Sequence, residues 1–188
     1  PFGAHDERNH AAARVAAEFA AQMPVAETPE HTTEYEGFFH LLNLEGNVEQ
    51  ARLTYIIRDH SKARFEERKV LMQRAADWAN ARYGEGTVSV EIADQYYNMR
   101  QMIEPVPHVV DLALEAMKQT GITPRVRAIR GGTDGAQLSF MGLPCPNLFA
   151  GGLNFHGPHE FLPIPSLEKA SELVVKICEL TAAHFGQR

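Results

Sequence analysis

The strongest constraint on the fold is a change in hydrophobic patterning near the middle of the chain. Before the segment Glu104-Pro105-Val106-Pro107, amphipathic helical repeats are mixed with stretches of alternating apolar residues. After this segment, helical repeats alternate with short, continuously apolar stretches. The two prolines are typical of a linker, and the 188 residues suffice for one large domain or two small ones. We therefore place a domain boundary between residues 104 and 105.

The first half is predicted to be an α+β domain. Helices are expected from Asp6 to Met23 and from Ser61 to Tyr83, with strands around residues 38–44, 51–57 and 88–92. The resulting order is αββαβ. One more strand before Pro1 would complete a ferredoxin-like split βαβ sandwich, in which two helices cover four strands.

The second half is predicted to be part of an α/β domain. Helices are expected over residues 108–119 and 166–185, a glycine-rich turn and short helix over 131–141, and short apolar strands around 126–129 and 147–149. Two or three strands make a poor sheet, so this half is expected to belong to a larger domain.

Composition excludes several classes of function. The net charge of -6 argues against a nucleic-acid partner, because affinity for nucleic acid comes largely from lysine and arginine. No apolar run approaches the roughly 20 residues of a membrane span, and no signal peptide is visible. Cys145 and Cys178 are too few for a disulfide framework. These features predict a cytoplasmic protein, and the start at Pro1 without methionine predicts a fragment or processed product.

The densest candidate site is the loop of residues 151–160, which follows a predicted buried strand. It contains two histidines and a carboxylate, and α/β proteins place their sites in such loops. His156 supplies an imidazole, which is a common zinc ligand, and Glu160 or His159 could orient it. The alternative is a polar turn with surface histidines, because this spacing is a weak metal signal outside a helix.

The second candidate is the glycine-rich turn of residues 130–135. It opens a predicted helix, so its backbone N–H groups could meet an anion, and Arg130 could add a bidentate contact to a carboxylate. It lacks the G-K-[ST] of a Walker A loop and the G-x-G-x-x-G spacing of a dinucleotide-binding site. A tight structural turn capped by Thr133 or Asp134 is the alternative.

Weaker signals come from the first half. Taken alone, Arg58-Asp59 at the end of a predicted strand is typical of a surface pair, and His40 on a strand face is typical of a structural histidine. The stretch of residues 96–100 offers tyrosines and Asn98 for hydrogen bonding, although core packing is the simpler role of the tyrosines.

Five segments together resemble the peptidase T family of zinc aminotripeptidases, which belongs to a clan of two-zinc exopeptidases and deacylases. They occur in order across almost the whole chain, and the longest of them, RGGTDGAQLSFMGLPCP, is highly specific. The segments are residues 35–40, 55–59, 96–100, 130–146 and 154–161.

The resemblance implies a division of the chain between two domains. Residues 1–104 would form a lid or dimerisation domain that lacks its first strand, and residues 105–188 would form the C-terminal part of the zinc-bearing catalytic domain. The resemblance also implies a homodimer formed through the lid domain and a small peptide as the substrate.

The resemblance also implies roles for individual residues. His156 aligns with the last zinc ligand of the family, with Glu160 four residues on. Arg58 and Arg130 resemble residues that face the active site and suit the carboxylate of a substrate, with help from Asn98. The turn that contains Gly132 and Thr133 would shape the pocket wall, and two zinc ions would activate a water that attacks the peptide bond.

The chain also departs from the family pattern. The His-x-Asp pair, the bridging aspartate, the Glu-Glu pair with the general base and a further acidic ligand are not identifiable, so no catalytic residue is assigned. One imidazole cannot hold two zinc ions. We therefore expect a fragment of an aminotripeptidase that is inactive alone. A non-catalytic dimerisation or binding module and a clan relative with another amide substrate are the alternatives.

Overall fold

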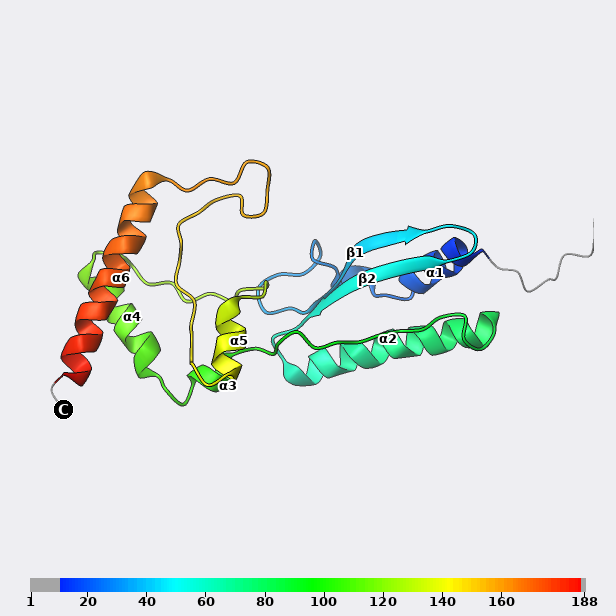
Figure 1. The fold of residues 1–188 in the computed structure, drawn as a ribbon, viewed down its shortest axis with the longest axis horizontal. Coiled ribbons are helices and arrows are strands. Elements are labelled where there is room, and N and C mark those ends of the chain that lie inside the picture. Colours follow the sequence, from blue (N-terminus) through cyan, green and yellow to red (C-terminus); the bar gives the residue numbers. More distant parts are fainter. Residues whose placement is uncertain (1–10, 187–188) are drawn as a thin grey trace, which may run out of the picture. The chain divides into compact units, whose positions relative to one another are not determined.

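The computed structural model describes residues 11–186 and divides into two compact units (Figure 1). The first unit runs to Tyr97 and includes Ala128–Arg130, and the second comprises Asn98–Arg127 and the residues from Gly131 onward. The expected start of the first helix at Asp6 lies outside the described residues. Within the described residues, no helix is both long and apolar enough to cross a membrane.

The first unit is built on an antiparallel hairpin. Strand β1 (Phe38–Gly46) pairs with β2 (Ala51–Arg58), from Phe38 opposite Arg58 to Gly46 opposite Ala51, with a shift in register between Leu41 and Asn43. The side chain of Asn47 closes the turn, because its Oδ1 accepts hydrogen bonds from the backbone N–H groups of Glu49 and Gln50. The predicted hairpin is confirmed.

Two helices supply most of the hydrophobic core of this unit. They are α1 (Ala12–Ala20), followed by the 3-10 turn η1 (Val25–Glu27), and α2 (Lys62–Tyr83), whose N-terminus is capped by the Ser61 hydroxyl. One face of β2 points at them, as its alternating pattern predicts. The core consists of Phe19, Met23, Phe39, Met72, Ala75 and Ala76, with Leu53, Tyr55 and Ile57 of β2 packed against it.

The strand predicted around residues 88–92 is not formed. Val88 and Val90 do pack against the core, but the described part of the sheet contains β1 and β2 only. The backbone of Val88 is bonded instead by the side chain of Asn80, which donates to its carbonyl at 2.9 Å and accepts from its N–H at 2.8 Å. A groove of about 980 Å³ separates this segment from β2, so it has no ladder partner. The predicted αββαβ topology is therefore incomplete here.

The second unit consists of helices joined by extended segments. Helix α3 (Arg100–Ile103) packs on α5 (Asp134–Phe140), and α4 (His108–Gln119) packs on α6 (Ile164–Phe185). The predicted long helices are confirmed.

The strands predicted around residues 126–129 and 147–149 are not formed in the structure. The described residues of the second unit form one isolated bridge, between Leu153 and Phe161. Val126 is 77% exposed and Leu148 39% exposed. A buried parallel strand needs neighbours on both edges, and none is described here.

The boundary between the units also differs from the one predicted at residues 104 and 105. Residues 98–104 belong to the second unit, because Ile103 is buried there and the Ser139 hydroxyl donates to Met99 Sδ. The lid and catalytic roles of the two halves stay predictions.

Candidate functional site

Arg58 lies at the end of β2, opposite Phe38 of β1. Its Nη2 donates to Gln95 Oε1 at 2.9 Å and its Nη1 to the carbonyl of Ile57 at 3.2 Å. The guanidinium carbon lies 5.0 Å from the centre of the Tyr96 ring. The half-buried guanidinium is therefore oriented by neutral groups.

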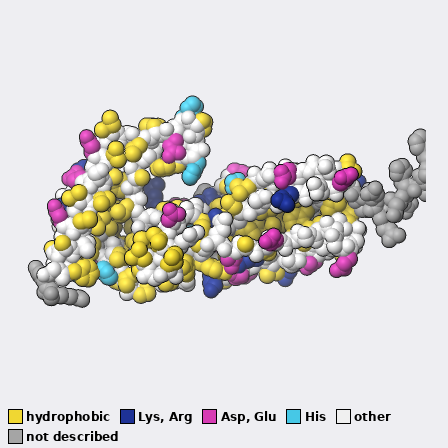
Figure 2. Space-filling view, in the orientation of Figure 1, with side chains coloured by type: hydrophobic (Ala, Val, Ile, Leu, Met, Phe, Trp, Pro, Cys, Tyr) yellow, Lys and Arg dark blue, Asp and Glu magenta, His cyan; other side chains and the backbone are white. Residues whose placement is uncertain are grey.

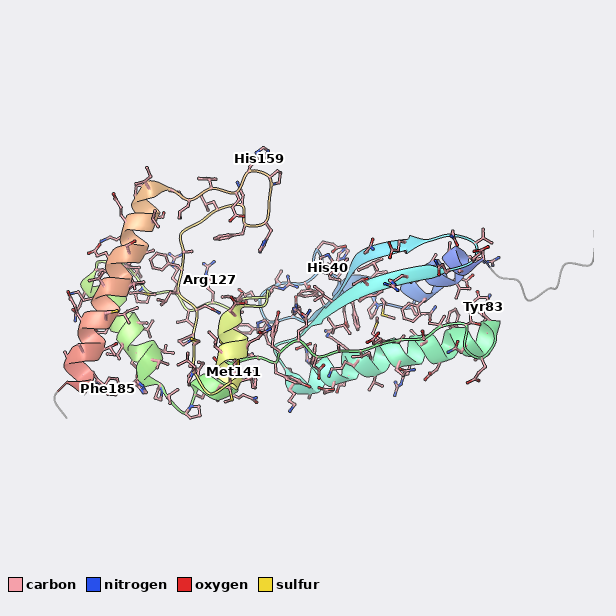
Figure 3. All side chains as sticks on the ribbon, viewed as in Figure 1. His40, Tyr83, Arg127, Met141, His159 and Phe185 are labelled. Carbon is pink, nitrogen blue, oxygen red and sulfur yellow. The ribbon has the colours of Figure 1, made fainter. Side chains whose placement is uncertain are left out.

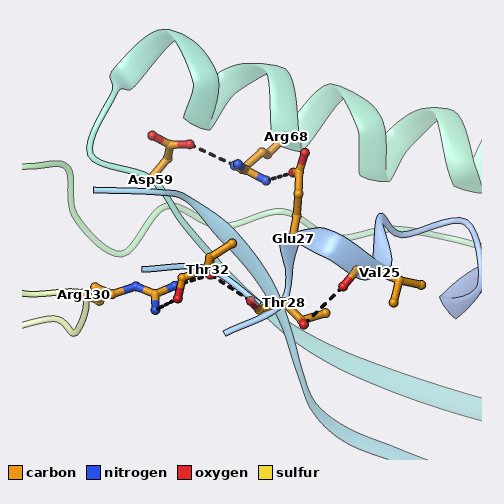
Figure 4. Close-up of polar contacts among 7 residues, drawn as sticks. All are labelled: Val25, Glu27, Thr28, Thr32, Asp59, Arg68 and Arg130. Atoms are coloured by element: carbon orange, nitrogen blue, oxygen red, sulfur yellow. Dashed lines mark hydrogen bonds and ion pairs between the residues drawn. The ribbon is translucent and has the colours of Figure 1, made fainter. Parts of the chain in front are cut away.

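Arg130 joins the first unit through contacts to the segment that precedes β1 (Figure 4). Its Nη1 donates to the carbonyls of Thr32 at 2.6 Å and Pro29 at 3.3 Å, and its Nη2 donates to the Thr32 hydroxyl. That hydroxyl in turn donates to the carbonyl of Thr28 at 2.8 Å. The Arg130 guanidinium carbon also lies 4.6 Å from the centre of the Phe38 ring.

These contacts bring the two arginines to the same end of the hairpin. Phe38 faces Arg58 across the strands and packs under Arg130, and residues paired across a ladder share a face. His40, two residues along β1, has its ring 6.5 Å from that of Phe38. Within the described residues neither guanidinium forms an ion pair, and Arg130 Nε is buried without a hydrogen-bond partner. This face carries positive charge that suits a carboxylate.

The isolated Arg58-Asp59 dipeptide suggested a surface pair, but Asp59 does not pair with Arg58. Its carboxylate accepts from Arg68 Nε at 3.0 Å, and its side chain is 2% exposed. Arg68 also pairs with Glu27 (Figure 4). The other Asp59 oxygen accepts from the N–H of Ser61, so this aspartate fixes the turn between β2 and α2.

A polar cluster around Lys69 was not predicted. Its Nζ lies 2.7 Å from Asp94 and 3.0 Å from Glu66, and the Tyr97 hydroxyl lies within hydrogen-bond distance of both carboxylates. Burial disfavours the charged amine, but hydrogen bonds to Asp94 and Glu66 raise the pKa of Lys69 above its usual value. The Lys69 hydrogen bond lowers the pKa of Asp94. Only the Glu66–Lys69 spacing was visible in the sequence.

In the second unit, His156 lies in a closed loop at residues 151–161. The backbone N–H and C=O groups of Leu153 and Phe161 bond to each other at 2.9 and 3.2 Å, and the loop tip projects outward at His159 (Figure 3). His156 has φ 64° and Asn154 φ 57°, which is uncommon for residues other than glycine. The His156 side chain is exposed, so its imidazole is accessible.

Glu160 acts on the backbone of His156 in this structure. Its Oε2 accepts from the N–H of His156 at 2.9 Å, which helps to hold the left-handed backbone conformation. Asn154 supports the same loop by donating from Nδ2 to the carbonyl of His159 at 3.2 Å. The loop thus presents His156 in a defined backbone geometry.

The remaining candidates lie at helix starts of the second unit. Thr133 precedes α5 in an extended conformation and makes no side-chain cap bond, and Gly132 beside it is exposed. The Asn98 side chain accepts from the backbone N–H of Arg100 at 3.0 Å, at the start of α3. Asn98 therefore has a structural contact of its own, which the sequence did not indicate.

A metal centre needs several ligands held close together. The described residues contain no group of three or more His, Cys, Asp or Glu side chains arranged to hold a metal ion. The imidazole of His156 is exposed, and a single imidazole supplies one ligand position of a metal centre.

Comparison with known proteins adds a family and a fold. The family model described as peptidase family M20/M25/M40 matches residues 6–180. A Peptidase T from Parabacteroides distasonis is 57% identical over 182 residues, which cover 97% of this chain and 44% of the relative. A Peptidase T from Geobacillus thermodenitrificans is 54% identical over 167 residues, covering 89% and 41%. The chain thus spans less than half the length of these curated relatives.

A solved structure shares the fold. The crystal structure of the aminopeptidase PepT from Bacillus cereus superposes with a TM-score of 0.60 over 93% of this chain and 46% of that one, at 23% sequence identity. At that identity the likeness concerns the mixed α/β fold alone.

Proposed function

Because this chain belongs to peptidase family M20/M25/M40, we propose that it supplies part of the active site of a zinc-dependent aminopeptidase that acts on tripeptides. The name Peptidase T, carried by relatives 57% and 54% identical to it, supports this proposal. The preference for tripeptides and for zinc rests on the family resemblance of the sequence.

The observation that carries the proposal is the pair of guanidinium groups at the end of the hairpin. Arg58 and Arg130 are held by carbonyl, amide and hydroxyl oxygens, and within the described residues neither is neutralised by a carboxylate. A substrate carboxylate would bind one or both of them by charge-assisted hydrogen bonds. The family resemblance of the sequence assigns Asn98, Gly132 and Thr133 to substrate binding as well.

His156 would hold one zinc ion through its exposed imidazole, and Glu160 would position it through the backbone. Zinc in such a centre polarises the scissile carbonyl and acidifies a bound water. We assign no general base or other catalytic residue to the described part of the chain. We therefore propose that the isolated chain is inactive unless the remaining zinc ligands are supplied. Its proposed location is the cytoplasm.

Dimerisation through the first unit is a second candidate function. Leu42 and Leu44 of β1 are 49% and 47% exposed, and within the described residues the outer edge of β1 has no partner strand. An exposed apolar edge of this kind favours pairing with a second copy. Sedimentation velocity of the chain and of a Leu44→Lys variant tests this candidate, which predicts a dimer for the first and a monomer for the second.

The aminopeptidase proposal can be tested in a full-length hybrid. In this hybrid the chain replaces the matched stretch of the Parabacteroides distasonis relative. His156→Asn is expected to lower the rate of trialanine hydrolysis about a hundredfold or more, because a metal ligand is lost. His159→Asn alters an exposed histidine of the same loop and serves as the control. Equal rates for the two variants would remove His156 from the site.

A further inference from the structure

We propose that Thr32 is a positioning residue, which holds the guanidinium group of Arg130 in the orientation that binds a substrate carboxylate. Thr32 is buried, and it accepts hydrogen bonds from Arg130 through both its backbone carbonyl and its hydroxyl group. The role of Thr32 rests on the proposed function, because Arg130 is the group that would meet the substrate. It adds the residue on which the direction of that guanidinium depends.

The contacts with Thr32 fix the whole plane of the guanidinium group. A guanidinium is planar, and its five N–H donors point in fixed directions. The Thr32 carbonyl accepts from Nη1 at 2.6 Å and the Thr32 hydroxyl accepts from Nη2, so one residue holds both terminal nitrogens. The Pro29 carbonyl also accepts from Nη1, at 3.3 Å. Because the group is planar, these bonds also set the direction of the N–H groups that remain for another acceptor.

Thr32 is itself held by a tight turn. The carbonyl of Thr28 accepts from the backbone N–H of His31 at 3.0 Å and from the Thr32 hydroxyl at 2.8 Å. Pro29 occupies the second position of this turn, where its fixed φ is favoured. A hydroxyl group has one hydrogen. Its bond to Thr28 therefore leaves only lone pairs of the Thr32 hydroxyl for Arg130.

The start of the turn is anchored to helix α2 (Figure 4). Glu27 directly precedes the turn and pairs with Arg68, whose Nε lies 3.0 Å from Asp59 Oδ2. The side chains of Arg68 and Asp59 are 11% and 2% exposed, and a satisfied polar network shielded from water is rigid. Asp59 directly follows Arg58 in the chain. The network therefore joins the backbone beside Arg58 to the turn that holds Arg130.

A purely structural role is the alternative for Thr32. The core cluster of the first unit lies between the hairpin and α2, where Figure 2 shows a band of hydrophobic side chains, and Thr32 is not part of it. Thr32→Val nearly keeps the shape of the side chain and removes the hydroxyl group. A selective effect of this variant on carboxylate binding therefore distinguishes positioning from folding.

Steady-state kinetics of the full-length hybrid provide the first test. Thr32→Val is expected to raise KM for trialanine about fivefold or more with little change in kcat, because a charge-assisted contact to the carboxylate is weakened. Trialanine amide lacks that carboxylate and should keep its KM. Thr32→Ser retains the hydroxyl group, so its KM should stay within about twofold of the parent. Thr33→Val alters the exposed neighbouring threonine and serves as the matched control.

Arg130→Gln separates a failure of the inference from a failure of the proposed function. It is expected to raise KM for trialanine at least as much as Thr32→Val, and the double variant should add little, because both changes act on one contact. An unchanged KM in Arg130→Gln would overturn the proposed role of Arg130 and that of Thr32 with it. A raised KM in Arg130→Gln with an unchanged KM in Thr32→Val would overturn the role of Thr32 alone.

A second measurement requires no activity. NMR relaxation of the arginine Nε–Hε groups in the ¹⁵N-labelled 188-residue chain reports how rigidly each guanidinium is held. Arg130 Nε is buried, and its signal is identified by its loss in Arg130→Gln. The order parameter of this group should be high in the parent and in Thr33→Val, and clearly lower in Thr32→Val. Equal order parameters in all three proteins would overturn the inference.

Discussion

Arg58 and Arg130 illustrate how much a single residue depends on the charge of its neighbours. Both guanidinium groups are oriented by neutral acceptors and by an aromatic ring. Such contacts fix the orientation of the guanidinium group and leave its positive charge uncompensated. A guanidinium group held in this way can bind an anion in a specific geometry. By contrast, the neighbouring Asp59 and Arg68 neutralise each other.

For Arg58 the expected phenotype is a change in substrate binding. In the full-length hybrid, Arg58→Gln should raise KM for trialanine about tenfold or more with little change in kcat, because an ion pair to the substrate is lost. Trialanine amide lacks the carboxylate, so its KM should be the same for both proteins. A KM that rises equally for both substrates would assign Arg58 a structural role instead.

For the Lys69 cluster the expected phenotype is a pH dependence of stability. The pKa of Asp94 is lowered in the folded state by the Lys69 hydrogen bond. Its contribution is therefore present above the unfolded pKa and is lost as the pH falls, from about pH 4 downward, through the folded pKa. Urea unfolding at pH 7 and pH 3 should show a smaller acid loss for Asp94→Asn than for the parent chain. An identical loss would contradict the assignment.

At this scale the sequence identified the chemistry of the candidate residues but not their partners. His156, Arg58 and Arg130 were identified by motif. Thr32, which holds Arg130, lies far from it in the sequence, and no local pattern marks such a contact. The role of Glu160 was also only partly foreseen, because its bond is to the backbone of His156 rather than to the ring.

Among the elements, the segment after α2 is held in place by a side chain rather than by a neighbouring strand. Asn80 provides Val88 with both a donor and an acceptor, and so replaces the neighbouring strand that a sheet would offer. The segment keeps its extended form and its apolar contacts with the core.

Removal of that side chain should therefore loosen the segment. Asn80→Ala is expected to lower the free energy of unfolding by about 1–3 kcal/mol, because two backbone groups of Val88 lose their partners. The amide of Val88 should also exchange its hydrogen faster. Gln73→Ala on the same helix removes only a bond to Asp77 and serves as the control. Equal losses in the two variants would show that the bonds to Val88 contribute little.

The elements show clearly where prediction from sequence succeeds. The hairpin and the long helices were predicted because their periodicity and their turn residues act locally. The strands around residues 88–92, 126–129 and 147–149 were predicted from apolar runs and are not formed. A strand requires a partner edge, and that requirement is not encoded in the segment itself.

At the scale of the whole molecule, the described residues form two compact units with little sheet. Among the described residues, the first has a two-stranded sheet with a groove along β2, and the second has helices without a sheet. The chain spans 44% of the Parabacteroides distasonis relative. Family membership could be predicted from the sequence because long motifs are present, whereas the sheets expected in both halves are not fully formed by the described residues.

The central claim is that His156 contributes one ligand to a zinc centre that the described residues do not complete. The direct test is the zinc content per molecule, measured by inductively coupled plasma mass spectrometry after gel filtration. The account predicts about two zinc ions in the full-length hybrid, fewer in its His156→Asn variant and no stoichiometric zinc in the 188-residue chain. Stoichiometric zinc in the chain alone, or unchanged zinc in the variant, would contradict it.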